Sequence, residues 1–467
     1  MLLAICFALF CAAMLWVGWR SGRNIHHLRA FLLSNQNVNQ CVLFTTIVAS
    51  FVGGGVVIGT AEKAFQFGIG HAIALLGFAL QLILTGVWIA PRMARFRNAL
   101  SLGDVVAQYY GKVPQILSGL LWLSFSVGIL TAQMSAMGNL LTSLLGFDRT
   151  ICVLISASIV VLYCTMGGIR AVIATDYFQF YLLTIALLLV TFFGIYTVGG
   201  LETLLQSLPA THLTPTSHLS TEALILLFCS FLLGDALIPP VFQRLLLSKS
   251  PKVTKKAFFW GGVLIVPIAF LACSHGLIAY VLDPGMAKDQ ITVNLFHQTL
   301  ATPFAIVAIL GFFAVIMSSA DTYLNAAAGS LVNDILIPLR QKKQFTDKQA
   351  LRFAKLTTVI LGGSAIYFAI AVQDIFDILI KTYEFWGPTM VVPLLAIMVN
   401  RTLPTYGFYA CVIAGGLTVV LWNTLELESI THLSALIAGM LANAMVYIGL
   451  FAIKVGLVQR DIVEEKV

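Results

Sequence analysis

Charged residues are scarce in this chain of 467 residues: only 10% are Asp, Glu, Lys or Arg, whereas 59% are hydrophobic. A soluble domain carries about a quarter charged residues, so this composition excludes a soluble globular protein. The mean hydropathy of +0.94 requires most of the chain to lie in lipid, because so much apolar surface is unstable in water. We therefore expect an integral protein of the lipid bilayer.

Catalytic and metal-binding motifs are also missing from the sequence. There is no CxxC pair, HExxH motif, Walker loop or readable Ser/His/Asp set, and the eight cysteines lie in or beside apolar segments. We interpret these cysteines as small hydrophobic residues and expect neither a disulfide framework nor an enzyme. The net charge of +7 belongs in loops that face lipid headgroups, so nucleic acid is not an expected partner.

Long apolar segments are what the sequence has in quantity. A membrane-spanning helix needs about 20 mostly apolar residues. We count thirteen such segments, which begin near residues 2, 41, 72, 114, 150, 173, 222, 257, 303, 352, 375, 405 and 431. Because lipid leaves no backbone group unpaired, these long runs must be helical. The predicted fold is an all-α polytopic membrane protein with about 13 transmembrane helices.

The distribution of Lys and Arg predicts the orientation of these helices. The loops and tail on one side of the membrane hold 23 of the 27 basic residues, and the other side holds Lys63, Arg149, Lys288 and Lys381. By the positive-inside rule, the basic side and the C-terminus are cytoplasmic. An odd number of helices then places the N-terminus outside.

Two of the segments carry helix-breaking residues in mid-membrane. Segment 2 contains Gly53, Gly54 and Gly55 in a row, and segment 7 has Gly234 and Asp235 shortly ahead of a Pro-Pro pair. If segments 2 to 6 and 7 to 11 form two five-helix repeats, each break falls in the first helix of a repeat, and an odd helix number makes the repeats inverted. Matching interruptions point to the binding site of a transporter. Close helix packing and a simple kink are the alternatives.

Segment 9 carries polar residues inside an apolar run: Ser318, Ser319, Asp321, Thr322 and Asn325. Hydroxyl and carbonyl oxygens are the hard ligands that a small cation takes. The serine pair, with carbonyls freed where segment 2 unwinds near Ala49 and Val52, is therefore a candidate sodium site. The alternative is that each serine bonds to the carbonyl four residues earlier in its own helix.

Two acidic residues lie within or at the end of predicted spans. Asp235 lies at the break of segment 7, and Asp176 opens segment 6. A carboxylate in the membrane is unfavourable unless it is paired, so such a residue indicates function. For Asp235 the alternative is a salt bridge or a cap on the second half-helix. For Asp176 it is an N-cap at the cytoplasmic end of its helix.

Several stretches resemble the sodium/solute symporter family, which includes bacterial proline, sialic acid and sugar transporters. The most specific is GGIRAVIATDYFQ at 167–179, which is similar to the family's GG…AV…TD..Q signature. Further similar stretches are FLLSNQNV, GGGVVIGTAEKAFQFG, SLGDVVAQYYG, QRLLLSKS, MSSADTYLNAAAGSLVNDI and GPTMVVPLLAIMVNRTLPTYGFYACVIAGG. They run from about residue 20 to residue 416 and cover nearly the whole core.

The resemblance implies the inverted-repeat fold of the leucine transporter, with one extra helix before the core and two after it. We expect an extra N-terminal helix and cytoplasmic loop over 1–40, the first inverted repeat over 41–200 and the second over 201–400. Residues 401–467 then hold two C-terminal helices and a short cytoplasmic tail.

The resemblance also implies positions for coupling cations. The family's main sodium site uses carbonyls of segments 2 and 9 and two adjacent hydroxyls, which map onto Ala49, Val52, Val315, Ser318 and Ser319. Asp176 matches an aspartate near a second cation site in some members, helped by a hydroxyl that Thr322 supplies here. Asp321 stands where the family more often has a small residue, which leaves the stoichiometry open.

The substrate does not follow from the resemblance. Sugar-transporting members have a polar side chain at the position of Val56 and an Asn-Gln pair at Ile238 and Pro239, so a sugar is disfavoured. Asp235 at the membrane midplane suits a small zwitterion or amine, and cation–π contact would come from nearby aromatic side chains. The candidate aromatic residues are Phe51, Phe231, Phe385 and Trp386.

We predict a secondary active transporter that couples sodium to the symport of a small organic solute by alternating access. Sodium is the expected coupling ion, the bacterial cytoplasmic (inner) membrane the expected location and a monomer the expected functional unit. The alternatives are a proton-coupled symporter that uses Asp235 or Asp176, and a non-coupling membrane sensor or channel on the same fold.

Overall fold

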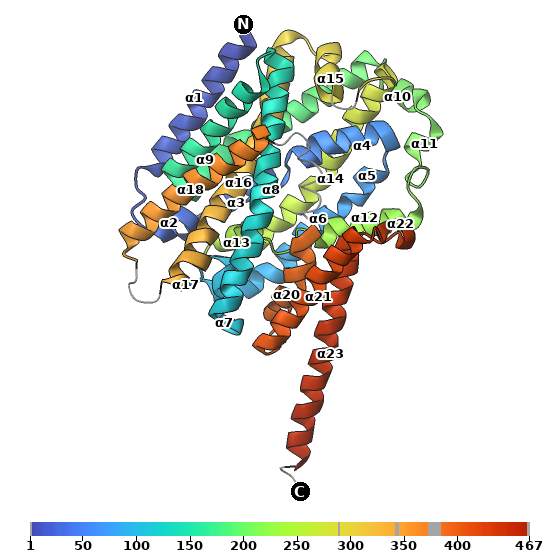
Figure 1. Cartoon of the computed structure of the whole chain (residues 1–467). Helices are drawn as coiled ribbons and strands as arrows, with labels where there is room; N and C mark the ends of the chain where they lie inside the picture. Colours follow the sequence, from blue (N-terminus) through green and yellow to red (C-terminus); the bar gives the residue numbers. More distant parts are fainter. Residues whose placement is uncertain (1, 288–289, 341–344, 372–383, 465–467) are drawn as a thin grey trace.

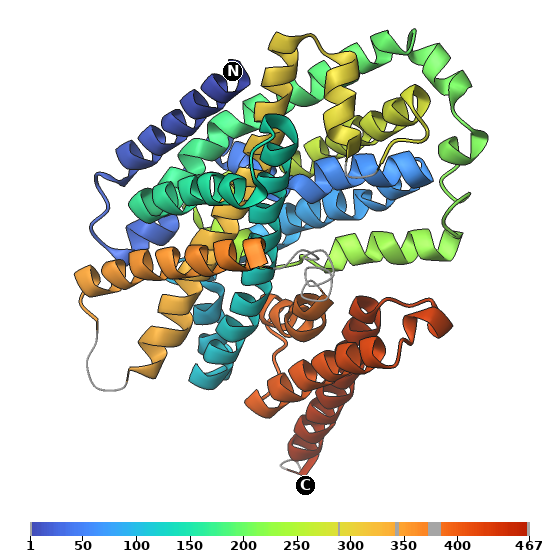
Figure 2. The same ribbon diagram turned by 45° about the horizontal axis from the view of Figure 1, so that its top comes forward.

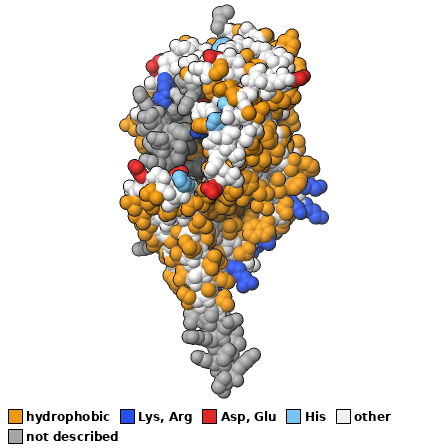
Figure 3. Space-filling view, turned by 90° about the vertical axis from the view of Figure 1, so that its right-hand side faces the viewer, with side chains coloured by type: hydrophobic (Ala, Val, Ile, Leu, Met, Phe, Trp, Pro, Cys, Tyr) orange, Lys and Arg blue, Asp and Glu red, His pale blue; other side chains and the backbone are white. Residues whose placement is uncertain are grey.

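The computed structural model describes residues 2–287, 290–340, 345–371 and 384–464, which form helices joined by loops (Figure 1). Within these ranges the strand-like pairing is limited to one isolated antiparallel bridge, between Asn37 and Ser248. Hydrophobic side chains cover much of the face in Figure 3, as a surface in contact with lipid requires. The prediction of an all-α membrane protein is confirmed.

The first part of the chain runs from α1 to α9. The helices are α1 (Leu2–Gly22), α2 (Leu28–Leu33), α3 (Gln40–Phe51), α4 (Thr60–Phe67), α5 (Gly70–Ala74), α6 (Leu76–Leu84), α7 (Leu102–Tyr110), α8 (Lys112–Leu145) and α9 (Arg149–Thr197). Short 3-10 or π-helical turns join some of them: η1 (Ser34–Gln36), η2 (Gly55–Gly59), η3 (Thr85–Ile89) and η4 (Ala90–Phe96).

The second part runs from α10 to α23. Its elements up to residue 371 are α10 (Leu201–Ser207), α11 (Ala210–Leu213), α12 (Thr221–Leu233), α13 (Pro239–Leu246), α14 (Pro251–Leu282), α15 (Ile291–Thr299), α16 (Thr302–Ser330), η6 (Leu331–Leu336), α17 (Ile337–Leu339) and α18 (Asp347–Ala371). The remaining elements are η7 (Gly387–Val391), α20 (Val392–Met398), α21 (Thr405–Thr424), α22 (Glu428–Thr431) and α23 (Ala435–Glu464).

Nine helices among the described residues are long and apolar enough to cross a membrane, and α3 with η2 and α4 makes ten if that bent pair is one span. Predicted segments 5 and 6 correspond to the two parts of α9, which are separated by a kink where Gly168 leaves the helical conformation (φ 48°, ψ −142°). Predicted segment 7 is divided into α12 and α13, and segment 11 lies partly outside the described residues. The count of thirteen and the orientation therefore stay predictions.

Helix α16 lies at the centre of the molecule. Every residue from Gly311 to Ser330 is buried, and the helix packs against α3, α8, α9 and α18. Its polar side chains therefore face other protein groups and not lipid. Helix α14 packs against α3, α4 and α6, whereas α21 and α23 pack on each other at the edge near the C-terminus (Figures 1 and 2).

Polar side chains fix where several of the spanning helices begin. The Asn39 side chain accepts a hydrogen bond from the N–H of Val42 at 2.9 Å and caps α3. Asp148 caps α9, Ser220 caps α12 and Ser250 caps α14 in the same way. Each cap satisfies N–H groups that have no partner in the first helical turn. The cap at Asn39 sets the start of the helix that ends at the candidate site.

Candidate functional site

The first predicted break lies between α3 and η2. Helix α3 ends at Phe51, and Val52 leaves the helical conformation with φ −87° and ψ 74°. The two parts of the span are bent by 60°. The interruption predicted from Gly53–Gly55 is therefore confirmed. Carbonyl groups at the end of α3 have no helical partner here and are available to other donors or to a cation.

Ser318 on α16 lies against the end of α3. Its hydroxyl donates a hydrogen bond to the carbonyl oxygen of Ala49 at 2.6 Å and to that of Val315 at 3.0 Å. The neighbouring hydroxyl of Ser319 donates to the carbonyl oxygen of Ser50 at 3.2 Å. All these groups are buried. Hydroxyl and carbonyl oxygens from two helices therefore meet at one point beside the break.

The structure thus brings together most of the residues that the sequence suggested as sodium ligands. Ala49, Val315 and Ser318 are in direct contact, Ser319 bonds to the next carbonyl along α3, and Val52 is the first residue of the break. The bond from Ser318 to Val315 is the local, structural bond expected of any helical serine. The bond to Ala49 is different, because it joins two helices.

Gly53 lets α16 approach the break closely. A β-carbon at this position would lie 2.7 Å from Oγ of Ser319, closer than real contacts of this kind. A β-carbon on Gly54 would lie 3.2 Å from Ile316, whereas one on Gly55 would meet no atom of the described residues within 4 Å. The Gln133 side chain on α8 lies 3.6 Å from both of the first two positions. Sequence reasoning missed Gln133, because one glutamine in an amphipathic helix carries no signal.

A salt bridge lies next to this point, in the centre of the molecule. The guanidinium of Arg244 on α13 lies 3.7 Å from Oδ2 of Asp176 on α9, and both side chains are fully buried. The same Oδ2 accepts hydrogen bonds from the hydroxyl of Thr46 and, at 3.0 Å, from that of Ser50. Asp176 lies within the part of α9 that follows the kink at Gly168 and not at an N-cap.

A second carboxylate, Asp321, lies on the other side of Arg244. The hydroxyl of Tyr163 donates to its Oδ2 at 2.5 Å, and that of Thr322 donates to its Oδ1 at 3.4 Å. Nη2 of Arg244 donates to Thr322 at 2.6 Å and to Ser50 at 2.7 Å. The guanidinium thus reaches both carboxylates through hydroxyl groups. We name these residues the buried polar cluster: Thr46, Ser50, Tyr163, Asp176, Arg244, Asp321 and Thr322.

The charges of the buried polar cluster do not balance. It contains two carboxyl groups, of Asp176 and Asp321, and one guanidinium, that of Arg244. Among the described residues, Oδ1 of Asp176 and Nε of Arg244 are buried without a hydrogen-bond partner. Buried polar atoms normally have partners. A free carboxylate oxygen next to several hydroxyls is a chemically suitable ligand set for a second cation or a proton.

Sequence reasoning singled out Asp176, Asp321 and Thr322 but missed the residues that connect them. Thr46 and Ser50 are one helical turn apart, so they occupy one face of α3. That spacing was a readable signal. Arg244 follows Gln243 in an apolar stretch, where a cation needs a buried partner. The acid that pairs with Arg244 depends on how α9 packs against α13, so it could not be predicted from the sequence.

The second predicted break lies between α12 and α13. Helix α12 ends at Leu233, and α13 begins at Pro239 without a side-chain cap. Asp235 lies in the turn between them and is half-buried, whereas Ile238 occupies the N-cap position of α13. Nε1 of Trp386 donates to the carbonyl oxygen of Ala236 in this turn at 3.3 Å. The interruption predicted from the glycine and the prolines is confirmed.

The four candidate aromatic residues make different contacts in the structure. Trp386 contacts the break and packs with Trp122 at a centroid distance of 5.6 Å. Phe51 instead faces the guanidinium of Arg244 at 6.0 Å, and Phe231 packs on His71 at 5.5 Å. Phe385 lies beside Gly416 on α21. Among the predicted aromatics, the hydrogen bond of Trp386 marks it as the one joined to the break.

Tyr323 completes the aromatic surroundings of the second break. Its ring stacks on Trp122 at 5.8 Å and lies 6.2 Å from Phe125, which is 6.5 Å from Trp386. Asp235 directly precedes Ala236, whose carbonyl oxygen accepts the hydrogen bond from Trp386 of this aromatic group. An acid next to a group of aromatic rings is an arrangement that suits a positively charged nitrogen.

Comparison with solved structures defines the class of fold. A Na+-coupled sialic acid symporter in a substrate-bound outward-open state matches 97% of each chain with a TM-score of 0.87 and 18% sequence identity. The transporter MhsT in complex with L-phenylalanine matches 88% of this chain and 99% of its own, with a TM-score of 0.55 and 13% identity. The chain therefore has the leucine-transporter type of fold, which confirms that expectation.

The sequence comparison identifies the family. Residues 31–415 match the model of the sodium:solute symporter family, and the chain belongs to this family. It is 23% identical over 458 residues to the osmoregulated proline transporter OpuE of Bacillus subtilis, covering 94% of this chain and 92% of that protein. It is 25% identical over 429 residues to the human high affinity choline transporter 1, covering 86% and 72%. The chain is thus a membrane transporter of the sodium-coupled solute symporter class and not an enzyme.

Proposed function

We propose that the chain uses an inward sodium gradient to drive uptake of a small amine or zwitterion. The observation that carries the sodium assignment is the contact of the Ser318 hydroxyl with the carbonyls of Ala49 and Val315 beside the α3 break. The proposed ligands are the carbonyls of Ala49, Val52 and Val315 and the hydroxyls of Ser318 and Ser319. These oxygens are hard and uncharged, which suits a dehydrated sodium ion.

Sodium at this position would couple binding to conformation. Its ligands come from α3, which belongs to an interrupted span, and from α16, which is buried at the centre of the molecule. A cation that needs oxygens from both helices binds better when the two helices are close. It therefore shifts the population toward the state in which they are close, and its release permits the other state.

A second coupling cation would lie in the buried polar cluster. Oδ1 of Asp176 has no hydrogen-bond partner among the described residues, and the cluster holds one carboxylate more than its single guanidinium balances. Asp176, Asp321 and Thr322 are the proposed contributors. A proton on one carboxylate would balance the charge equally well, so this site is where proton coupling would act.

The proposed solute carries a positively charged nitrogen. The relatives named above are proline and choline transporters, and both of those solutes contain such a nitrogen. Asp235 offers an opposite charge at the second break, and Trp386 and Trp122 offer ring faces next to it. Gly53–Gly55 and Val56 at the first break, with Gly234 at the second, would form the backbone walls of the solute site.

The membrane arrangement is proposed on the same basis. The basic residues favour an outer N-terminus and a cytoplasmic C-terminus. Residues 41–200 and 201–400 are the proposed inverted repeats, because each begins with an interrupted span. We propose a bacterial cytoplasmic membrane location and a functional monomer.

Sodium binding to the purified protein tests the proposal without knowledge of the solute. Binding is measured in sodium against potassium at constant ionic strength, for the wild type and for Ser318→Ala/Ser319→Ala. The control is Ser364→Ala, because Ser364 bonds only to the carbonyl of Leu361 in its own helix at 2.9 Å. We expect saturable sodium binding in the wild type and the control and its loss in the double variant. Equal response to sodium and potassium in the wild type would contradict sodium coupling and favour protons.

A further inference from the structure

A second network of buried polar groups joins α7 to the far end of the central helix. We name Ser101, Asp104, Asn333 and Asp334 the α7 network. Nδ2 of Asn333 donates to Oγ of Ser101 and to Oδ1 of Asp104, both at 2.8 Å, and to Oδ1 of Asp334 at 3.1 Å. One amide therefore holds two carboxylates and the residue that caps α7.

Asp334 is enclosed by this network and by a glycine. Its side chain is buried, accepts from Oγ of Ser330 at 2.6 Å and is also hydrogen-bonded to the hydroxyl of Ser101. A β-carbon on Gly103 would overlap the carboxyl carbon of Asp334. The close approach of η6 to α7 therefore depends on glycine at this position. The network fixes α7 to the helix that carries Ser318 and Ser319.

Asp104 holds the loop in front of α7. Its Oδ2 accepts a hydrogen bond from the N–H of Leu100 at 2.8 Å, and its Oδ1 accepts from Nε2 of Gln115 at 3.2 Å. Burial raises the pKa of the Asp104 carboxyl, whereas the hydrogen bonds from Leu100, Asn333 and Ser101 and the charge of Arg29 lower it. The N–H donors therefore stabilise the carboxylate that fixes the position of Leu100.

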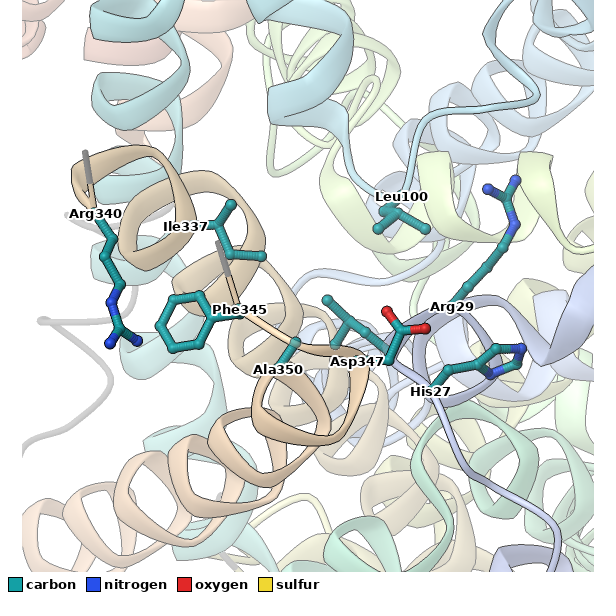
Figure 4. Close-up of a pocket in the computed structure, with 9 residues that line it drawn as sticks. His27, Arg29, Leu100, Ile337, Arg340, Phe345, Asp347 and Ala350 are labelled. Atoms are coloured by element: carbon teal, nitrogen blue, oxygen red, sulfur yellow. The ribbon is translucent and has the colours of Figure 1, made fainter. Parts of the chain in front are cut away.

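Leu100 lines two separate spaces. One is an open cavity of about 490 Å³, in which Figure 4 places Leu100 near Arg29 and Asp347, with Arg340 towards the other end. The other is a space of about 20 Å³ that Leu100 shares with Gln243 and other residues. A space of that size holds about one water molecule. Leu100 is therefore a wall that the open cavity and the small space have in common.

The small space leads to the buried polar cluster. Nε2 of Gln243 donates to Oδ1 of Asn325 at 2.9 Å, and Nη1 of Arg244 donates to Oε1 of Gln243 at 3.1 Å. Arg244 in turn pairs with Asp176. Polar groups thus continue from the cluster to the small space, and Leu100 lines both that space and the open cavity.

We propose that Leu100 is the gate through which coupling ions leave for the cytoplasm, and that the α7 network is the latch that holds this gate closed. The proposal rests on the proposed function for the identity of the ions. The gate itself is a statement about access and is testable alone. Release of the α7 network would free the loop before α7 from α16, so Leu100 would leave its place between the two spaces.

A cysteine at Ala326, which lines the small space, reports whether the gate is open. The variant Ala326→Cys is labelled in inside-out membrane vesicles with a small, charged, membrane-impermeant thiol reagent. The protein without the Ala326→Cys substitution gives the background labelling of the eight native cysteines. We expect slow labelling of the reporter with Leu100 present. Adding Leu100→Ala should raise the rate about tenfold or more, because the apolar barrier is removed.

The latch is tested in the same reporter. Asp334→Asn keeps the size of the side chain but removes the charge that accepts from Ser330, and Gly103→Ala pushes Asp334 away. Both should also speed labelling, by about tenfold, since a hydrogen bond to a charged group is lost. Leu28→Ala is the matched control, because Leu28 lines the open cavity but not the small space.

The outcomes separate the gate from the sodium assignment. Leu100→Met keeps the side-chain volume and should label at the slow rate, which shows that substitution at this position is tolerated. Two results would overturn the gate. One is that Leu28→Ala speeds labelling of the reporter as much as Leu100→Ala does. The other is that neither Leu100→Ala nor Asp334→Asn changes the labelling rate. Sodium binding is measured on the same samples. Its absence from the wild type would defeat sodium coupling while the labelling rates still decide whether Leu100 closes the route.

Discussion

The guanidinium of Arg244 lies 3.7 Å from the carboxylate of Asp176, and neither side chain is exposed. The pair joins α13, which follows the second break, to α9, and the hydroxyl of Ser50 at the end of α3 contacts both partners. Both interrupted spans therefore meet at one ion pair. A change in either span must rearrange the same buried charges.

Breaking this ion pair is predicted to destabilise the protein strongly. Arg244→Gln leaves a buried carboxylate without its cation, which costs about 3 kcal/mol or more in folded proteins. We expect a clear fall in the thermal unfolding temperature of the detergent-purified protein. The double variant Arg244→Gln/Asp176→Asn should recover part of the loss, because no unpaired charge remains in the pair.

Arg170 on α9 provides the control for that prediction. It lies on the same helix as Asp176, and its guanidinium bonds to the carbonyl oxygen of Asn24 near the surface. Arg170→Gln should lower the unfolding temperature little, since exposed hydrogen bonds contribute about 1 kcal/mol or less. Equal losses in Arg170→Gln and Arg244→Gln would mean that the buried pair has no special importance.

Two glycines at the first break are predicted to differ sharply. Gly53→Ala places a β-carbon 2.7 Å from Oγ of Ser319 and must displace that hydroxyl, whereas Gly55→Ala meets no atom within 4 Å in the part of the chain that the structure describes. If Ser319 is a sodium ligand, Gly53→Ala should weaken sodium binding about tenfold or more. Gly55→Ala should change it about twofold or less. Titration calorimetry with sodium, without solute, measures both variants, and similar affinities would remove Ser319 from the site.

Most of the architecture followed from composition and from the position of breaking residues. Segments such as α8 and α14 are long apolar runs, so their helical state was decided by the cost of unpaired backbone groups in lipid. The breaks were readable because Gly53–Gly55 and the prolines at 239 and 240 weaken helices locally. The two parts of α9 on either side of Gly168 were predicted as separate segments, whereas the direct connection of the two parts through one kink was not predicted.

The site was predicted only in part, for a different physical reason. Ser318 stood out because a hydroxyl pair is unusual in an apolar run, and the structure places it against Ala49. Arg244 and Tyr163 belong to the site because of their contacts with residues on other helices. The sequence pattern of one helix does not show which helices it contacts, so these two residues could not be predicted. The same applies to Asn333 and Asp104, which are 229 residues apart and yet share a hydrogen bond.

Asp321 is predicted to set the number of cations that the protein binds. The buried polar cluster has two carboxyl groups and one guanidinium, so one negative charge remains for a bound cation. Asp321→Asn removes that charge, and the sodium-to-protein ratio at saturation should fall from about two to about one. Tyr163→Phe is the control, because it removes the hydrogen bond to Asp321 but keeps the charge. A ratio near one in the wild type would contradict the second sodium ion.

Asp235 is predicted to select a positively charged solute. It lies in the turn between α12 and α13, where Nε1 of Trp386 donates to the carbonyl oxygen of Ala236. Choline and proline are the first ligands to test, with sodium present, by the thermal stabilisation that they give the purified protein. Asp235→Asn should weaken binding of the stabilising ligand about tenfold or more, because an interaction between opposite charges is lost. Asp283→Asn should not, since that carboxylate accepts from the N–H of Gly285 at 3.0 Å in an exposed turn away from the second break. Unchanged affinity in Asp235→Asn would place the solute's charge elsewhere and leave Asp235 as a structural residue of the break.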